Sequence, residues 1–155
     1  MKLARIVLFA VAALLALPAI AQTSSDMQIL AQKIKADKKL VVAANMQLTE
    51  AEAKGFWPVY EAYQNELQGI NKQLLGVIKD YAGVYNKGPV SDEAAKKLIN
   101  QAIAVEEAEV KLKRSYVPKL EKVIPGMKVA RYLQIESKIR AIGKFELAAQ
   151  IPLVE

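Results

Sequence analysis

Two residue types that carry much of enzyme chemistry are missing from this chain of 155 residues: it has no histidine and no cysteine. Without histidine the chain lacks imidazole bases, triads built on imidazole and histidine-ligated zinc sites. Without cysteine it lacks disulfides, so packing alone must stabilise the fold. No glycine-rich turn or nucleophile motif stands out either. We therefore expect a protein that binds a partner and is not an enzyme, with no cofactor and no metal.

The first 21 residues have the pattern of a secretory signal peptide. The start Met1–Arg5 carries two basic residues, residues 6–17 are apolar, and a small residue, Ala21, precedes Gln22. This order is typical of a cleavable signal. The apolar run is shorter than the ~20 residues that a membrane span requires. We expect cleavage after Ala21, export to the periplasm, and no transmembrane anchor after cleavage.

The remaining residues 22–155 have the size of one ordinary domain. Because Lys2 and Arg5 leave with the signal, 20 basic and 16 acidic side chains remain, a formal charge of +4. This mild basic excess suits an anionic partner or a membrane surface. Basic blocks with interleaved aromatic residues, which nucleic-acid binding requires, are absent from the sequence. We predict a single domain with no nucleic-acid partner.

The first helix of this domain is predicted to begin near Ser25. Apolar residues recur after it at spacings of three and four, with Asp37 in the one polar gap, and this favours an amphipathic helix. They are Met27, Leu30, Ile34, Val41, Ala44 and Leu48. The polar face of this helix holds a basic cluster made of Lys33, Lys35, Lys38 and Lys39.

A second helix is predicted to begin with a capping box at Thr49 and Glu52, in which each side chain bonds the backbone amide of the other residue. The apolar residues that follow alternate steps of four and three, as in a coiled-coil seam. They are Phe56, Tyr60, Tyr63, Leu67, Ile70, Leu74, Val77 and Tyr81. Pro58 lies inside this run, and we expect a bend near residues 54–57.

A turn is predicted at residues 86–91, where Gly88 and Pro89 interrupt the pattern and Ser91 can cap the next helix. The second and third helices must then form a long antiparallel hairpin. The third helix is expected to bury Leu98, Ile99, Ala102, Val110 and Tyr116.

The end of the chain is predicted to hold a short helical piece and a last helix. Pro118 and Pro125-Gly126 should isolate residues 119–123, and the last helix should run over residues 127–150. Its apolar face is broad, and it consists of Val129, Tyr132, Ile135, Ile139, Ile142 and Leu147. A monomer with few helices cannot easily cover such a face, so we expect a homodimer. The predicted fold class is all-α, with four to five helices.

Three charged residues, Glu106, Glu109 and Lys113, fall near the middle of the apolar stripe of the third helix. Charges there need partners. One interpretation is a carboxylate metal site or a patch that faces a ligand. The other is a structural salt-bridge cluster with Arg131 or Arg140, and both interpretations stay open at this point.

The tyrosines are numerous for a domain of this size, and they combine an apolar ring with a polar tip. Core packing explains most of them. Tyr116 and Tyr132 are our candidates for contact with a partner, because an adaptable binding surface needs this mixture.

The segment around Leu48, Thr49 and Glu52 resembles the Leu-Thr-x-x-Gln signature of the Spy/CpxP family of periplasmic proteins. Signal peptide, size, helical content and basic balance agree with this family. Glu52 stands where the signature has glutamine, and residues 124–128 match the second copy of the signature poorly. The resemblance implies a helical homodimer whose concave basic face binds unfolded or stressed envelope proteins without ATP.

The leading hypothesis is a periplasmic chaperone or stress-response adaptor of the Spy/CpxP type. Its charged contacts with unfolded envelope proteins would come from the lysine cluster of the first helix together with Lys128, Arg131 and Arg140. The alternative is a structural or assembly protein whose apolar helical faces dock on one fixed envelope partner.

Overall fold

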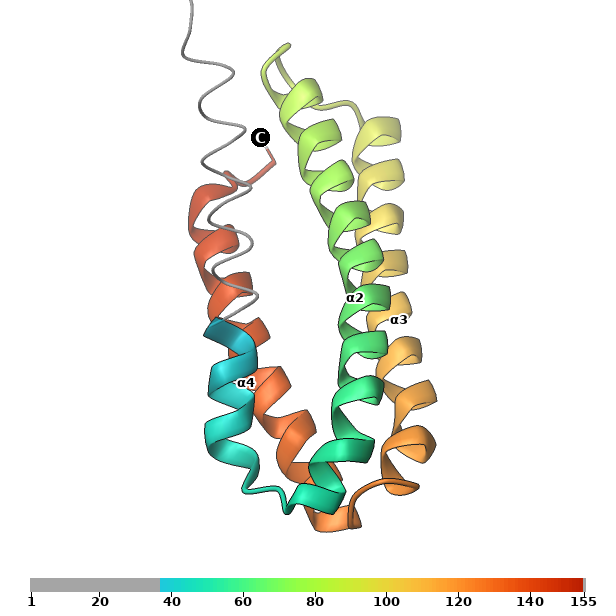
Figure 1. Ribbon diagram of the computed structural model, residues 1–155. Coiled ribbons are helices and arrows are strands. Elements are labelled where there is room, and N and C mark those ends of the chain that lie inside the picture. Colours follow the sequence, from blue (N-terminus) through green and yellow to red (C-terminus); the bar gives the residue numbers. More distant parts are fainter. Residues whose placement is uncertain (1–36, 155) are drawn as a thin grey trace, which may run out of the picture. The chain divides into compact units, whose positions relative to one another are not determined.

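The computed structural model describes residues 37–154, and every regular element in that range is a helix (Figure 1). Residues 37–46 are helical, and they are followed by α2 (Glu50–Tyr85), α3 (Asp92–Glu121) and α4 (Gly126–Gln150). Residues 42–154 belong to one compact unit, and residues 37–41 belong to a separate N-terminal unit. The all-α prediction is confirmed, while the homodimer and the single domain over residues 22–155 stay predictions.

Helix α2 begins with the predicted capping box. The amide of Thr49 donates to Glu52 Oε2 at 2.8 Å, and the amide of Glu52 donates to Thr49 Oγ1 at 3.3 Å. The helix continues through Pro58 to Tyr85 without interruption. Buried Phe56 and Tyr60 lie on either side of the proline, so packing stabilises the turn that lacks one amide donor. The bend predicted near residues 54–57 stays a prediction.

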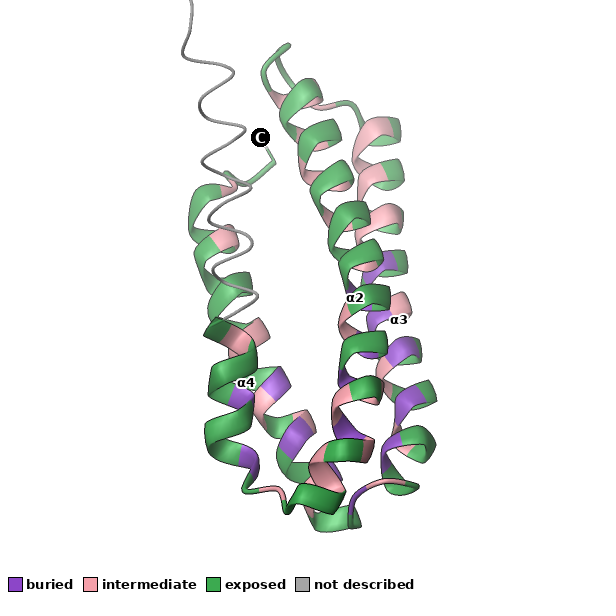
Figure 2. Cartoon of the chain, in the orientation of Figure 1, coloured by how far each residue is buried: buried purple, intermediate pink, exposed green. Residues whose placement is uncertain are grey.

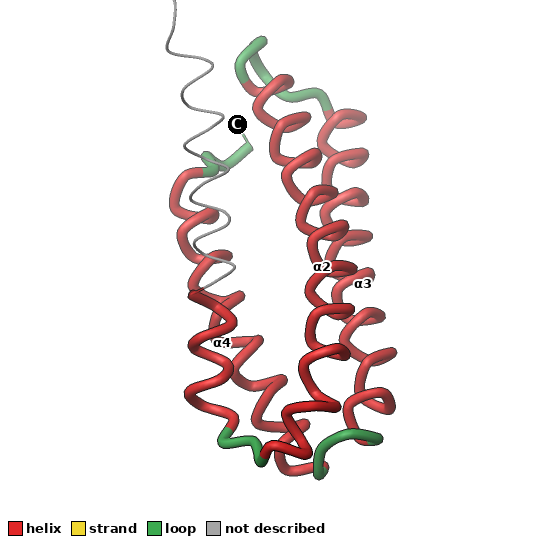
Figure 3. Tube along the Cα trace, viewed as in Figure 1, coloured by secondary structure: helices red, strands yellow, loops and turns green. Residues whose placement is uncertain are grey.

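Helices α2 and α3 form the predicted antiparallel hairpin, joined by a short loop (Figures 1 and 3). The loop uses Gly88 at φ 127°, a conformation that favours glycine. Ser91 then caps α3, since its Oγ accepts the amide of Ala94 at 3.3 Å. The ring of Tyr63 on α2 lies 5.2 Å from that of Tyr116 on α3, centroid to centroid.

The break predicted at Pro118 is wrong, because α3 runs through this residue to Glu121. Pro118 removes an amide that would have bonded the carbonyl of Arg114. The turn after it places Leu120 and Ile124 in the core, where both are buried. The apolar area that they bury compensates for one missing hydrogen bond near the end of the helix. The separate helical piece over residues 119–123 therefore does not form.

The prediction of which face of the first helix is buried is also wrong for residues 37–46, the part of this helix that the structure describes. Val42 and Met46 are fully buried, whereas Val41 and Ala44 are exposed. The helix ends at residue 46, so Leu48 lies in the following loop and does not extend the face expected from its spacing. The other apolar residues predicted for this face, Met27, Leu30 and Ile34, lie outside the described residues.

The stripe predicted for α3 is rotated from the buried one. Ile99 and Val110 are each 57% exposed. The buried residues of the helix are Val105, Glu109, Leu112, Tyr116 and Leu120. Spacings of three and four allow neighbouring faces of one helix, and the position of α2 and α4 selects between them.

The core contains a cluster of aromatic rings from α2, α3 and α4. We call it the aromatic core, and it consists of Phe56, Trp57, Tyr60, Tyr63, Tyr116 and Tyr132. Ring pairs meet edge to face, as in Phe56 with Tyr132 at 5.2 Å between centroids. Figure 2 shows that buried residues gather in the halves of α2 and α3 farthest from the loop that joins them. The halves nearer that loop are half-buried or exposed.

Candidate functional site

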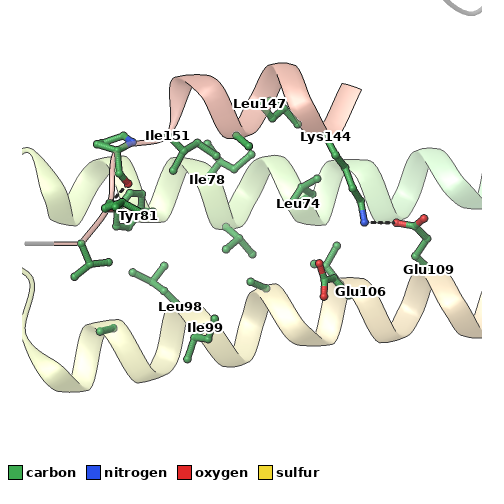
Figure 4. A pocket seen from close by; sticks show the side chains of 18 residues that line it. Leu74, Ile78, Tyr81, Leu98, Ile99, Glu106, Glu109, Lys144, Leu147 and Ile151 are labelled. Atoms are coloured by element: carbon green, nitrogen blue, oxygen red, sulfur yellow. Dashed lines mark hydrogen bonds and ion pairs between the residues drawn. The ribbon is translucent and has the colours of Figure 1, made fainter. Parts of the chain in front are cut away.

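An apolar groove of about 430 Å³ lies between the loop-proximal halves of α2 and α3 and the end of α4 (Figure 4). Its α2 wall continues the predicted seam through Leu74, Val77, Ile78 and Tyr81. Its α3 wall consists of Ala95, Leu98, Ile99, Ala102 and Val105. The third wall consists of Leu147 and Ala148 on α4 and of residues 151–154 after it. Charged groups, Glu106, Glu109 and Lys144, occur at one end only.

The groove stays open because the apolar seam of α2 extends beyond the area that the other helices cover. Leu67 is buried, but Leu74 and Val77 on the same seam are half-buried. Leu147 of α4 reaches this part of the seam, and Ile142 on α4 is directed to solvent with 63% exposure. Contiguous apolar surface of this kind makes the groove a candidate binding site.

A polar layer lies between the aromatic core and the groove, and Arg140 is its centre. The Arg140 guanidinium donates to both Glu109 carboxylate oxygens, at 2.6 and 2.5 Å, and to Asn71 Oδ1 at 3.1 Å. These contacts connect α4 with α3 and α2. A bidentate pair of this geometry fixes the relative register of the helices as well as compensating the buried charge.

Glu109 is buried, and burial by itself raises the pKa of its carboxyl. The hydrogen bonds and charge of Arg140 outweigh that effect, with smaller contributions from Lys144 and Lys113, so the pKa is lowered overall. Lys144 Nζ lies 3.5 Å from Glu109 Oε2, at the end of the groove. The carboxylate therefore stays ionised at neutral pH, and the salt-bridge interpretation of this cluster is confirmed for Glu109.

A second polar group lies inside the aromatic core around Glu136, which is fully buried. Gln64 Nε2 donates to Glu136 Oε2 at 3.1 Å and to the Tyr132 hydroxyl oxygen at 3.2 Å. Burial raises the pKa of Tyr132 and Tyr63 above the ordinary range, and Glu136 adds to the effect in both. Among the described residues, the buried Tyr63 hydroxyl has no hydrogen-bond partner. These phenols act as neutral core groups.

The two tyrosines predicted to contact a partner lie in the core. Tyr132 is fully buried, and Tyr116 is buried with its hydroxyl donating to Glu66 Oε1 at 2.5 Å. Burial, followed by the hydrogen bond to Glu66, raises the pKa of Tyr116 to about 12. A partner could reach either ring only if the core opened, so neither residue belongs to the groove.

The predicted basic contacts are dispersed. Lys128 Nζ binds Glu52 Oε2 at 2.5 Å and the Gln47 carbonyl at 2.9 Å, and this lowers the pKa of Glu52. Of the motif residues, Glu52 thus connects the start of α2 to α4, Thr49 caps α2 with it, and Leu48 packs against the core. Arg131 is exposed on α4.

The other basic candidates are not gathered in one place either. Arg140 is occupied by Glu109. Lys38 and Lys39 each have interactions of their own, and both lie in the N-terminal unit. Lys33 and Lys35 lie outside the described residues. Within the unit from Val42 onward, the structure brings none of the predicted basic residues to the groove.

The other interpretation was a carboxylate metal site. In residues 37–154, no group of three or more acidic side chains is placed to hold a metal ion. Glu106 is exposed at the groove, and Lys113 is half-buried. Sequence reasoning missed the groove itself. The available signal was the continuation of the α2 seam to Tyr81, beyond the length that the proline-terminated last helix can cover.

Comparison with protein-family models, with curated proteins and with solved structures finds no match for this chain. In the part of the chain that the structure describes, no helix is both long and apolar enough to cross a membrane.

Proposed function

We propose that this protein is an exported binding protein of the periplasm that holds apolar segments of unfolded envelope proteins without ATP. It would act as a chaperone or stress adaptor of the Spy/CpxP type. The observation that carries the proposal is the apolar groove, which leaves the seam of α2 uncovered beyond Leu67. Unfolded chains expose such apolar side chains, and their burial in the groove lowers the free energy by roughly 25 cal/mol per Å².

The composition of the groove supports a role in binding. Its walls are aliphatic, and its charged end is compensated because Lys144 lies beside Glu109. A surface of this composition discriminates little between apolar sequences, since hydrophobic attraction has no direction. Weak discrimination is what a protein that binds many unfolded clients requires.

The proposal can be tested with two matched surface variants on α3. Ile99 lines the groove and Val110 does not; both are β-branched and 57% exposed. They are eleven residues apart, about three helical turns, so they face nearly the same way. Ile99→Glu should abolish suppression of light scattering by a reduced, aggregating client protein, whereas Val110→Glu should retain it. Equal behaviour of the two variants would exclude the groove as the binding site.

A second candidate function is a structural protein that docks on one fixed envelope partner. It is favoured by Ile142 and Phe145, which are 63% and 76% exposed on one face of α4 and do not line the groove. Crosslinking in cells through a photoreactive residue at position 145 separates the candidates. One stoichiometric product supports docking on a fixed partner, and a broad distribution of products supports a chaperone.

A further inference from the structure

The C-terminal segment of the chain itself lies at the mouth of the groove (Figure 4). Helix α4 ends at Gln150, and Ile151 has extended backbone angles, φ −96° and ψ 114°. Pro152 follows it, and a proline disfavours helical angles at the residue before it and supplies no amide donor. The Pro152 carbonyl accepts a hydrogen bond from the Tyr81 hydroxyl at 3.0 Å.

This segment, residues 151–154, is apolar and weakly held. Ile151 is half-buried, while Leu153 and Val154 are 86% and 56% exposed. Its backbone contacts the groove through the hydrogen bond from the Tyr81 hydroxyl to the Pro152 carbonyl. One hydrogen bond contributes little net free energy, so a ligand that fills more of the groove can bind more strongly than this segment does.

The contact with Tyr81 also indicates what kind of ligand the groove accepts. A side-chain hydroxyl that donates to a main-chain carbonyl recognises the peptide backbone and not a particular side chain. Any extended peptide can present the same carbonyl, with apolar side chains on either side of it. Residues 151–154, which form one wall at the mouth of the groove, are one such peptide, and they belong to the protein itself.

From this we propose that residues 151–154 are a tethered competitor for the groove. The partner class is an extended apolar peptide, whose backbone carbonyl replaces that of Pro152 on the Tyr81 hydroxyl. This inference rests on the proposed function and adds two things to it: the conformation of the bound client and a built-in limit on its affinity. A tethered segment competes at an effective concentration set by its tether, which is in the millimolar range for short ones.

The charges of the groove favour a peptide over a fatty acid. A fatty-acid carboxylate at the charged end would approach Glu106 and Glu109, and the nearest cation, Lys144, is already 3.5 Å from Glu109. A neutral peptide segment meets no such repulsion, and it can use the hydroxyl of Tyr81 at the other end.

The experiment compares the full chain with a chain that ends at Gln150. The probe is a fluorescent synthetic peptide with the sequence Ile-Pro-Leu-Val-Glu of residues 151–155, and the control peptide has serine in place of leucine and valine. We expect the shortened chain to bind the probe roughly three- to tenfold more tightly than the full chain, because every groove is then available. Tyr81→Phe in the shortened chain should weaken binding by about threefold to tenfold.

Each outcome decides between the claims. Equal affinity of the two chains for the probe, with circular dichroism confirming that both are folded, would overturn the tethered competitor. Displacement of the probe by dodecanoate but not by the reduced client would overturn the peptide as partner. If the shortened chain binds the probe more tightly but neither chain suppresses client aggregation, the competitor stands and the proposed chaperone function fails.

Discussion

The apolar seam of α2 is closed at one end of the α2–α3 hairpin and open at the other. Far from the connecting loop, aromatic rings from three helices close the seam, and Tyr63 is fully buried. Near the loop, aliphatic side chains continue the same spacing, but Leu74 and Tyr81 remain half-buried at a groove. The periodicity of the sequence does not distinguish these ends. What differs is how far α4 covers the seam. Side chains of α4 cover it at Tyr132 and cover little of it beyond Arg140.

The Arg140 layer explains why the difference is abrupt. A buried bidentate pair must keep its geometry to compensate the charge of Glu109, so it fixes the separation of α3 and α4 at this level. Below it the helices pack on the aromatic core, and above it they enclose the groove. Stability should therefore depend mostly on one region and binding mostly on the other.

Alkaline pH should have the largest effect, because four tyrosines of the aromatic core are buried together. Burial raises the pKa of Tyr60 to about 12 from the ordinary 10.0, and it raises those of Tyr63, Tyr116 and Tyr132 as well. The folded state therefore retains protons that the unfolded state loses, and stability falls as pH rises from 10 toward 12. At about 1.4 kcal/mol per pKa unit, the four groups together amount to several kcal/mol. Phenolate absorbance of these four residues should appear together with loss of helical circular dichroism.

Tyr63→Phe provides the control for the alkaline transition. Its hydroxyl is buried without a hydrogen-bond partner, so removing it should cost little at neutral pH and should move the alkaline midpoint upward. Gradual phenolate formation without unfolding would show that the core is more open to water than its burial indicates.

Removal of Arg140 should have the next largest effect, because it breaks the salt bridge that separates the aromatic core from the groove. Arg140→Ala leaves the Glu109 carboxylate buried with only the weaker influence of Lys144 and Lys113, and we expect a loss of about 3 to 5 kcal/mol in the free energy of unfolding. Arg131→Ala is the matched control on the same helix, and its exposed side chain should matter by less than about 1 kcal/mol. The measurement is urea denaturation, and similar losses for the two variants would argue against the polar layer.

Replacement of two seam leucines should give a smaller but more direct comparison. Leu67 and Leu74 occupy the same seam position one heptad apart, the first buried and the second half-buried at the groove. Leu67→Ala should cost about 3 kcal/mol with binding unchanged, whereas Leu74→Ala should cost about 1 kcal/mol and weaken capture of the reduced client. Equal costs would mean that the groove closes in solution.

The sequence predicted the parts of the fold that depend on local chemistry. The Thr49 capping box, the turn at Gly88 and the α2 seam are specified by residues close together in the chain, and the structure confirms them. The break at Pro118 was wrong because the packing of Leu120 is a tertiary contact, which no local rule contains. The partner of Glu109 was anticipated among two arginines, although spacing alone could not choose Arg140.

The groove could not be predicted for the same physical reason. Its α2 wall is visible in the sequence as the seam through Leu74 and Tyr81, but openness depends on what the other helices leave uncovered. For Glu52, by contrast, the sequence suggested a role and the structure adds a second one. Its position suggested a family signature, and the structure gives it a local role as well, since it caps α2 and binds Lys128.

Two helical glycines give the smallest and sharpest test of the difference between the regions. Gly76, near the open groove, has nothing within 4 Å of the position of an added Cβ, so Gly76→Ala should stabilise the protein by about 0.5 to 1 kcal/mol through helix propensity. Gly55, beside the aromatic core, would place that carbon 3.0 Å from the Cβ and Cγ1 atoms of Val123. Overpacking there should reverse the sign, making Gly55→Ala destabilising by about 1 kcal/mol. Adding Val123→Ala should recover part of that loss, and thermal unfolding of the variants would measure each step. A stabilising Gly55→Ala would show that the aromatic core has room to adjust, which a closed region should lack.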